Sequence, residues 1–168
     1  MIILETARIR VRELGDHDLE HMFKFMSDPD IMRYIRAPDT DRAAVRERMT
    51  KWAQYHAEHP KLGVFALETL DTANFAGYCV ARHVNFEAGK DLEVGYAVGP
   101  EFAGQGLATE VAAGLAAYLF QEFQPEKVVA FTAPENTASQ RVLEKSGFQR
   151  TGTAEVYDGE SVVFELYR

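Results

Sequence analysis

The chain has 168 residues, of which 46% are hydrophobic, and it carries a formal net charge of -8. This length and apolar content suit a single domain over residues 1–168, with a core large enough for a mixed sheet covered by helices. The negative charge argues against a nucleic-acid binder that neutralises phosphates with clustered Lys and Arg, and it favours a cationic substrate.

The cysteine count and the N-terminal pattern favour the cytoplasm. Cys79 is the one cysteine, so an intrachain disulfide is excluded, and residues 1–5 lack the pattern of a signal peptide. No apolar run approaches the roughly 20 residues that a membrane span needs. We therefore expect a cytoplasmic protein that binds neither nucleic acid nor membrane.

The first third of the chain predicts one strand and two helices. Apolar residues alternate with arginines over residues 7–11, which is the pattern of a half-buried strand with outward-facing arginines. Apolar residues at helical spacing then predict a helix with Asp16 as its N-cap. A second helix, capped by Asp39 or Thr40, is expected to run to Pro60.

Three strands are predicted in the middle of the chain, where the period changes from 3.6 to 2. Residues 62–69 and 75–85, with a polar turn between them, indicate a hairpin. A third strand, 92–98, places its apolar side chains on one face and Glu93 on the other. Gly95 within it indicates a bulge, or a place where a ligand or another backbone comes close.

The last third alternates between helix and strand. A helix from Gly104 to about Phe123 precedes a buried strand, 127–133, and Asn136 can cap the next helix. Strands at 148–153 and 161–167 complete the chain, and they could supply a pairing edge. We therefore expect either a monomer or a homodimer.

The loop 103–109 connects a predicted strand to a predicted helix and contains two glycines. Gly104 and Gly106 allow a tight turn, so successive N–H groups can converge on an anion at the positive end of the helix dipole. No Lys-Ser/Thr pair follows the second glycine, which excludes a nucleotide P-loop. The loop therefore predicts a phosphate cradle, with a plain turn as the alternative.

Two motifs together carry a family resemblance: the loop 103–109 followed by Glu110, and the run 136–148. Residues 4–9, 27–34 and 93–96 also match. With these segments the chain resembles the GCN5-related N-acetyltransferases (GNAT), most closely the RimJ/RimL-type branch of ribosomal-protein alanine acetyltransferases.

The resemblance implies an α/β fold and a co-substrate. The fold would be a single mixed, mostly antiparallel sheet of about seven strands, flanked by helices and splayed between the fourth and fifth strands. The co-substrate would be acetyl-CoA, with its pyrophosphate on the loop amides and its pantetheine arm along the fourth strand. The implied binding residues are Tyr96, Ala97, Val98, Gly104, Gln105, Gly106, Leu107, Ala108, Thr109 and Asn136.

Glu93 and Ser139 are the candidate catalytic residues that the resemblance implies. Glu93 would deprotonate the attacking amine through water, while a backbone amide within 94–96 stabilises the oxyanion. Ser139 would protonate the leaving thiolate, because Leu143 stands where many relatives carry a tyrosine. A solvated strand glutamate and a helix-capping serine are the alternative interpretations.

These assignments predict an enzyme that moves an acetyl group to a primary amine, either a protein N-terminus or a small molecule, by direct attack in a ternary complex. No metal is expected, because His56 and His59 lack a third ligand in any obvious pattern. A non-catalytic acyl-CoA-binding module of the same fold is the alternative, and the missing helix tyrosine is its main support.

Ala103 is the position where the loop departs from the family pattern, which has Gln or Arg there. An Ala103→Arg variant should bind acetyl-CoA roughly fivefold more tightly, as one added ion pair of about 1 kcal/mol would allow. Calorimetric titration measures this, with Ala88→Arg as a control for the overall charge. Unchanged affinity would show that residue 103 does not face the pyrophosphate.

Overall fold

The period-2 segments of the sequence become strands of one sheet in the computed structural model, which describes residues 1–168. Its strand order is β1-β2-β3-β4-β5-β6-β8-β7, and only the β5–β6 pair is parallel. The strands are β1 (Ile2–Glu5), β2 (Ile9–Glu13), β3 (Gly63–Thr69), β4 (Phe75–His83), β5 (Leu92–Val98), β6 (Lys127–Thr132), β7 (Gln149–Val156) and β8 (Gly159–Tyr167).

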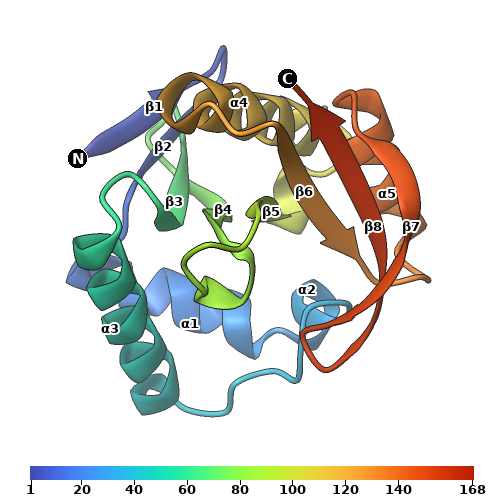
Figure 1. The fold of residues 1–168 in the computed structure, drawn as a ribbon. Helices are drawn as coiled ribbons and strands as arrows, with labels where there is room; N and C mark the ends of the chain where they lie inside the picture. Colours follow the sequence, from blue (N-terminus) through green and yellow to red (C-terminus); the bar gives the residue numbers. More distant parts are fainter.

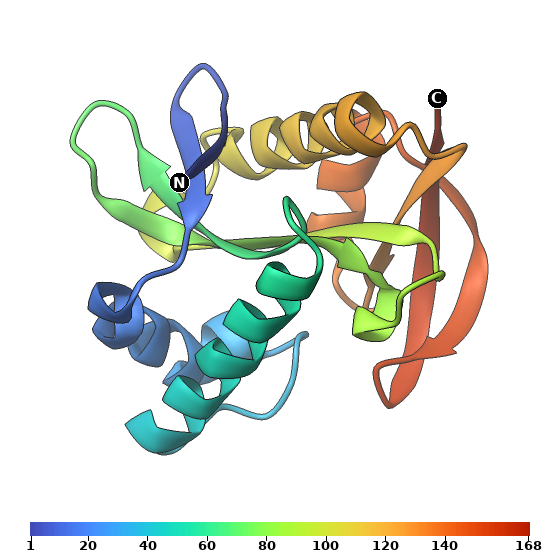
Figure 2. The same cartoon turned by 60° about the vertical axis from the view of Figure 1, so that its left-hand side comes forward.

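Helices cover both faces of this sheet. The helices are α1 (Leu19–Ser27), α2 (Pro29–Met32), α3 (Arg42–Glu58), α4 (Leu107–Phe123) and α5 (Thr137–Lys145), with 3-10 turns η1 (Asp16–Asp18), η2 (Val84–Phe86) and η3 (Pro100–Phe102). In Figures 1 and 2, α4 and α5 lie on one face, and α1, α2 and α3 lie on the other. None of the helices combines the length and the apolar composition that crossing a bilayer requires.

The predicted mixed, mostly antiparallel sheet is confirmed, with eight strands rather than about seven. The additional strand, β1, has no clear alternation in its sequence, and its register with β2 shifts between Ile2 and Leu4. The predicted helix caps also need correction. Asp41 rather than Asp39 or Thr40 caps α3, through its side chain and the Ala44 amide.

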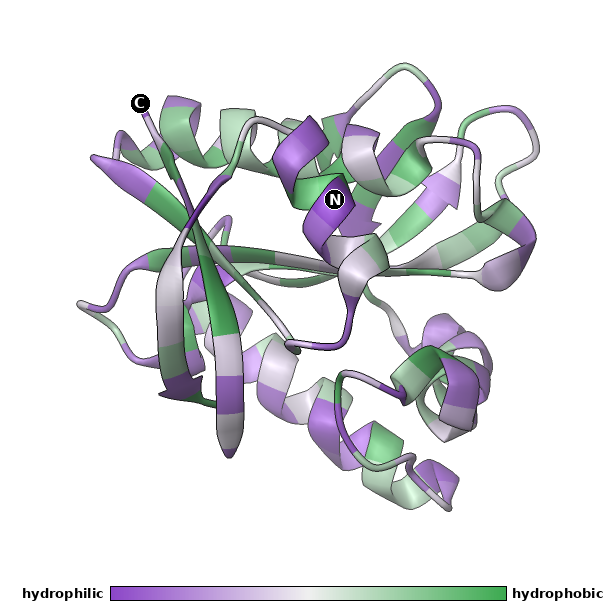
Figure 3. Cartoon of the chain, turned by 90° about the vertical axis from the view of Figure 1, so that its right-hand side faces the viewer, coloured by the Kyte–Doolittle hydropathy of each residue, from purple (hydrophilic) through white to green (hydrophobic).

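Apolar side chains form one cluster on each face of the sheet. Leu92 and Val94 of β5 belong to the cluster beneath α4, which includes Leu115, whereas Ala97 belongs to the cluster beneath α1. Each fully buried leucine or valine contributes roughly 1.5–3 kcal/mol. In Figure 3 the helices carry alternating hydrophobic and hydrophilic bands, as expected for amphipathic helices that cover a sheet.

The sheet splits between β5 and β6. These strands pair only at Leu92 with Val128 and at Glu93 with Val129. Beyond these residues β6 continues with β8 and β7 away from β5, as Figure 1 shows. The splay predicted between the fourth and fifth predicted strands, which are β5 and β6, is therefore confirmed.

Of the alternatives that Gly95 suggested, the bulge is not present. The β4–β5 register continues through the pairing of Gly95 with Val80 without a shift. The irregularity lies instead in β4, next to Gly77, whose φ is +147°. A Cβ atom at Gly77 would stand 2.0 Å from the Ala97 carbonyl oxygen, so the two strands approach too closely there for any other residue.

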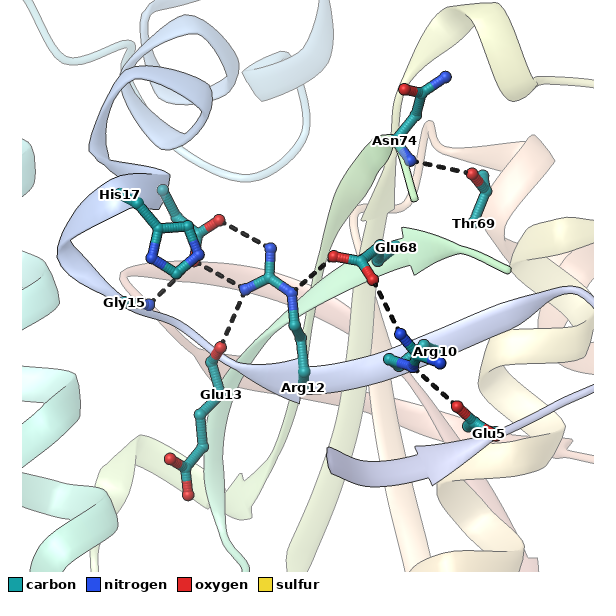
Figure 4. Close-up of polar contacts among 10 residues, drawn as sticks. Glu5, Arg10, Arg12, Glu13, Gly15, His17, Glu68, Thr69 and Asn74 are labelled. Carbon is teal, nitrogen blue, oxygen red and sulfur yellow. Dashed lines mark hydrogen bonds and ion pairs between the residues drawn. The ribbon is translucent and has the colours of Figure 1, made fainter. Parts of the chain in front are cut away.

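Arg12 does not face solvent, as the alternation predicted, but joins β2 to its neighbours (Figure 4). Its guanidinium donates to both oxygens of Asp18 at 2.9 Å and to Glu68 of β3 at 2.9 Å. The Asp18 side chain is only 1% exposed. Burial alone raises the pKa of Asp18, but the bonds from Arg12 and from the Gly15 amide outweigh this and hold its pKa below the ordinary value. Asp16, the predicted N-cap, is the first residue of η1 and caps no helix; Asp18 is the N-cap of α1.

An Arg12→Met variant should lose about 3 kcal/mol of stability at pH 7, because it leaves the Asp18 carboxylate buried without its cation. A lowered pKa means that the contribution of Asp18 is complete at neutral pH and is lost as the pH falls below about 4. Urea unfolding of both proteins should therefore show a difference that shrinks toward acidic pH. Lys51→Met, which breaks an exposed pair with Glu47, is the control and should cost less than about 0.5 kcal/mol. A loss equal to that of the control would show that the Arg12–Asp18 pair is not needed.

Candidate active site

A pocket of about 570 Å³ lies where β5 and β6 separate. Its wall includes Glu93 and Gly95 of β5, Phe131 and Thr132 of β6, and Tyr157 from the turn between β7 and β8. A pocket of this size suits a small-molecule ligand.

Glu93 is buried rather than solvated, with 4% of the residue exposed. The strand alternation places it on the α1–α3 face of the sheet, opposite Leu92 and Val94. Its Oε1 atom accepts a hydrogen bond from Arg82 Nε at 2.7 Å. No hydrogen bond within the protein involves Oε2, although Glu93 lines the pocket, so this oxygen is the atom available to a ligand or a water molecule.

Tyr157 and Arg82 hold the Glu93 carboxylate in place, and neither was predicted from the sequence. The Tyr157 hydroxyl donates to Glu93 Oε1 and accepts from the Asn85 amide at 3.1 Å. Burial is the main reason that the pKa of Tyr157 rises to about 12. Arg82 also lies over the ring of Phe86, with 3.9 Å between the guanidinium carbon and the ring centroid. Arg82 of β4 stands opposite Glu93 of β5, so its position follows from the strand register. Tyr157 is distant in the sequence and reaches Glu93 only because the β7–β8 turn folds over this part of the sheet.

Tyr96 and Ser139 meet on the opposite face of β5. The Tyr96 hydroxyl lies 3.1 Å from Ser139 Oγ and donates to the Ser139 carbonyl oxygen at 3.3 Å. The Ser139 amide donates to Asn136 Oδ1 at 3.2 Å, so Asn136 caps α5 as predicted. Burial raises the pKa of Tyr96 to about 12, although the bond with Ser139 lowers it slightly. A protonated phenol therefore lies beside the serine hydroxyl at neutral pH, in the part of the fold where Leu143 is buried in the core.

The glycine loop adopts the tight turn that its sequence predicted. Gly104 and Gly106 have φ values of +74° and +77°, and Gly106 is the N-cap of α4. Residues 103–106 are exposed. Leu107, the first helical residue, has its side chain in the core, so only its amide is free to contribute to the cradle.

Arg8 and Glu110 fix this loop to the start of the sheet. Arg8 Nη1 donates to the Gln105 carbonyl oxygen at 2.8 Å, and Arg8 pairs with Glu110 at 2.8 Å. Glu110 Oε1 also accepts from the Thr6 hydroxyl at 2.5 Å. Residues 4–9 and the loop, which matched the same family in separate parts of the sequence, are thus in contact. Sequence reasoning did not connect them.

Several features fit the thioester arm and pyrophosphate of acetyl-CoA. Beyond Glu93, the β6 side of β5 has no strand partner, so the backbone groups of residues 94–98 that point away from β4 are free to bond an extended ligand. Thr132 Oγ1, across the split, is buried without a hydrogen-bond partner in the protein. A Cβ atom at Gly104 would meet nothing within 4 Å, which leaves its turn open to an anion. The Ala97 side chain packs beneath α1, on the other face of β5 from Tyr96 and Val98.

The structure contains no group of three or more His, Cys, Asp and Glu side chains that could hold a metal ion. His56 instead contacts Glu13 and the Leu62 carbonyl oxygen, each at 2.8 Å. His59 contacts the Tyr55 carbonyl oxygen.

A family model described as "Acetyltransferase (GNAT) domain" matches residues 8–149. The match covers β2 through the start of β7, and therefore includes both sides of the split and the glycine loop. The chain belongs to the GNAT family and is an acetyltransferase.

Two relatives from Bacillus subtilis (strain 168) match along most of their length. YkkB, an uncharacterized protein, is 31% identical over 96% of this chain and 94% of its own. YoaA, described as an uncharacterized N-acetyltransferase, is 30% identical over 92% of this chain and 87% of its own.

Solved structures share the fold. An acetyltransferase of the GNAT family from Bacillus anthracis has a TM-score of 0.82 and 22% identity, covering 99% of this chain and 98% of its own. The aminoglycoside acetyltransferase AAC(6')-Ib in complex with ribostamycin and coenzyme A has a TM-score of 0.78 and 21% identity, covering 95% and 93%. Spermidine N-acetyltransferase from Vibrio cholerae in complex with CoA and spermine has a TM-score of 0.78 and 20% identity, covering 95% of both chains.

Gly104→Ala should cost about 1 kcal/mol of stability, because a left-handed φ is unfavourable for any residue with a Cβ atom. Open space surrounds this position, so the loss would come from the backbone alone. Gly159→Ala is the matched control: its surroundings are equally open and its φ is not positive. Thermal unfolding of the two variants measures the difference. Equal midpoints would mean that the turn relaxes out of the left-handed region.

Proposed function

We propose that this enzyme transfers the acetyl group of acetyl-CoA to a primary amine by direct attack in a ternary complex, as a RimJ/RimL-type member of its family. The observation that carries the proposal is the split between β5 and β6. Glu93 borders it from one face of the sheet, and the Tyr96–Ser139 pair lies on the other face. An amine and a thioester that enter from opposite faces would meet at this split.

The glycine loop would bind the CoA pyrophosphate through the amides of residues 104–108, at the N-terminus of the 17-residue helix α4. Thr109 would add its hydroxyl, and Asn136 would contact the arm. Pantetheine would lie along Tyr96, Ala97 and Val98, where β5 has no neighbouring strand on its β6 side. The complexes of structural relatives with CoA or acetyl-CoA support acetyl-CoA as the co-substrate.

Glu93 would accept the proton of the attacking amine through a water molecule at Oε2. The neutral nitrogen then forms a bond to the thioester carbonyl carbon, and an amide within 94–96 stabilises the oxyanion. The fixed contacts with Arg82 and Tyr157 would keep the carboxylate oriented during this step.

The nitrogen is positively charged after this attack and loses its second proton to solvent water. Collapse of the tetrahedral intermediate then breaks the carbon–sulfur bond, and the departing sulfur takes a proton. Ser139 would donate it, and the adjacent Tyr96 hydroxyl would resupply the serine. This pair offers the proton that a helix tyrosine provides elsewhere in the superfamily. The buried Leu143 therefore gives less support to a non-catalytic acyl-CoA-binding module than the sequence alone suggested.

Glu93→Gln should lower kcat/KM for amine acetylation by about 10²-fold, and Ser139→Ala by about tenfold, because each removes a proton-transfer group. Neither should change acetyl-CoA affinity. Release of free CoA in the presence of an amine panel measures turnover, and calorimetry measures binding.

Asp91→Asn, an exposed acid next to β5, is the matched control for Glu93→Gln. If turnover survives both Glu93→Gln and Ser139→Ala, the assigned roles are wrong, although the activity stands. A wild-type protein that binds CoA and acetylates no amine would favour the non-catalytic alternative.

A cytoplasmic location and a monomeric or dimeric state remain predictions from the sequence.

A further inference from the structure

Two arginines in the same pocket share a single carboxylate. Arg36 and Arg48 both line the pocket, and both pair with Asp39. The distances are 3.3 Å from Arg36 Nη2 to Asp39 Oδ2 and 3.2 Å from Arg48 Nη2 to Asp39 Oδ1. These contacts are longer than the 2.7–2.9 Å typical of a charge-assisted hydrogen bond, which the Arg82–Glu93 pair of the same pocket reaches at 2.7 Å.

The two guanidinium groups are poorly satisfied by the protein. The Nε atoms of Arg36 and Arg48 are buried and have no hydrogen-bond partner. The only other hydrogen bond of the Arg36 side chain is to Met26 Sδ, at 3.5 Å. Burial, followed by repulsion from Arg48, lowers the pKa of Arg36. One positive charge is therefore left over in a partly buried pocket, where an unpaired charge is costly.

The other charges of the pocket do not remove this excess. Arg82 is paired with Glu93. Asp158 and Glu160 also line the pocket, but both are exposed at the β7–β8 hairpin, where water and salt screen them. The half-buried part of the pocket thus holds an uncompensated positive charge at Arg36 and Arg48, together with the Arg82–Glu93 ion pair.

Apolar side chains also line this pocket. Trp52, Val80 and Tyr78 belong to the wall, with Ile35 and Tyr34 among its exposed hydrophobic residues. Such a wall suits the apolar side chain of a ligand whose charged groups contact the polar residues of the pocket.

We propose that the amine acceptor is a small apolar molecule that also bears a carboxylate, such as a free amino acid, and that Arg36 and Arg48 bind this carboxylate while the amine faces Glu93. This assignment rests on the proposed function and specifies its substrate class. It runs against the cationic substrate that the net charge of -8 favours, because the local charges of the pocket differ in sign from the whole molecule. It also separates this chain from the structural relative whose complex contains spermine.

The test compares apolar L-amino acids with their α-amides, which differ in the carboxylate alone. The carboxylate favours the protonated form of the neighbouring amine, so intrinsic reactivity at neutral pH favours the amide. A preference for the acid therefore reports on the pocket. We expect kcat/KM, measured by CoA release, to be at least tenfold higher for the acid of the best pair, and calorimetry with saturating CoA to show the same preference in binding.

Three variants locate the source of this preference. Arg48→Met leaves one arginine for Asp39. It should bring the ratio of kcat/KM for the acid to kcat/KM for the amide close to one, by raising the KM of the acid. Asp39→Asn frees both arginines and should increase the ratio. Arg46→Met removes the same charge from an exposed position on α3 outside this pocket, and should leave the ratio unchanged.

The outcomes separate this assignment from the proposed function. If acids and amides bind equally, or neither binds, or Arg48→Met keeps the preference, the assignment is wrong. Acetylation of spermine or of the amides would then leave the proposed function standing. If acids bind with the expected preference and no amine is acetylated, the pocket assignment stands and the proposed function fails.

Discussion

The early end of the β5–β6 pairing is the constraint on which the site depends. Parallel strands normally pair along their length, since an unpaired backbone group in the interior is costly. Here the ladder stops at Glu93 and Val129 because β6 follows β8 and β7 away from the rest of the sheet. The opening exposes the backbone of β5 to a ligand. It also leaves a gap between β5 and β6 that lies beside residues of both faces of the sheet.

Strand alternation turns this opening into a site with two distinct sides. Glu93 and Tyr96 are three residues apart, so they project to opposite faces of β5. One face meets the polar contacts from β4 and the β7–β8 turn, and the other meets the N-terminal turn of α5. In the proposed mechanism, a proton acceptor at Glu93 and a proton donor at Ser139 would therefore act on two different reactants without neutralising each other.

Periodicity predicted most of the fold, because burial on one face leaves a regular trace in the sequence. It failed where a polar side chain, rather than an apolar one, makes the long-range contact. The strand alternation predicts that Arg12 faces solvent, yet its guanidinium binds the buried carboxylate of Asp18. The site shows the same division: the loop glycines and the Asn136 cap are local features and were predictable. Tyr157 lies 64 residues from Glu93 in the chain, and no local pattern links them.

The net charge of a chain does not determine the charge of its binding pocket. The net charge of -8 describes the field far from the surface, whereas a ligand inside a pocket responds to the few groups within several ångströms. Arg36, Asp39 and Arg48 come from the connection between α2 and α3 and from α3 itself, and they meet only when these segments fold over the sheet. Because the two arginines have one carboxylate between them, the fold keeps a positive charge beside the opening in β5 and β6. A second anion at that position would complete the set of ion pairs, and the acceptor is the molecule placed to supply it.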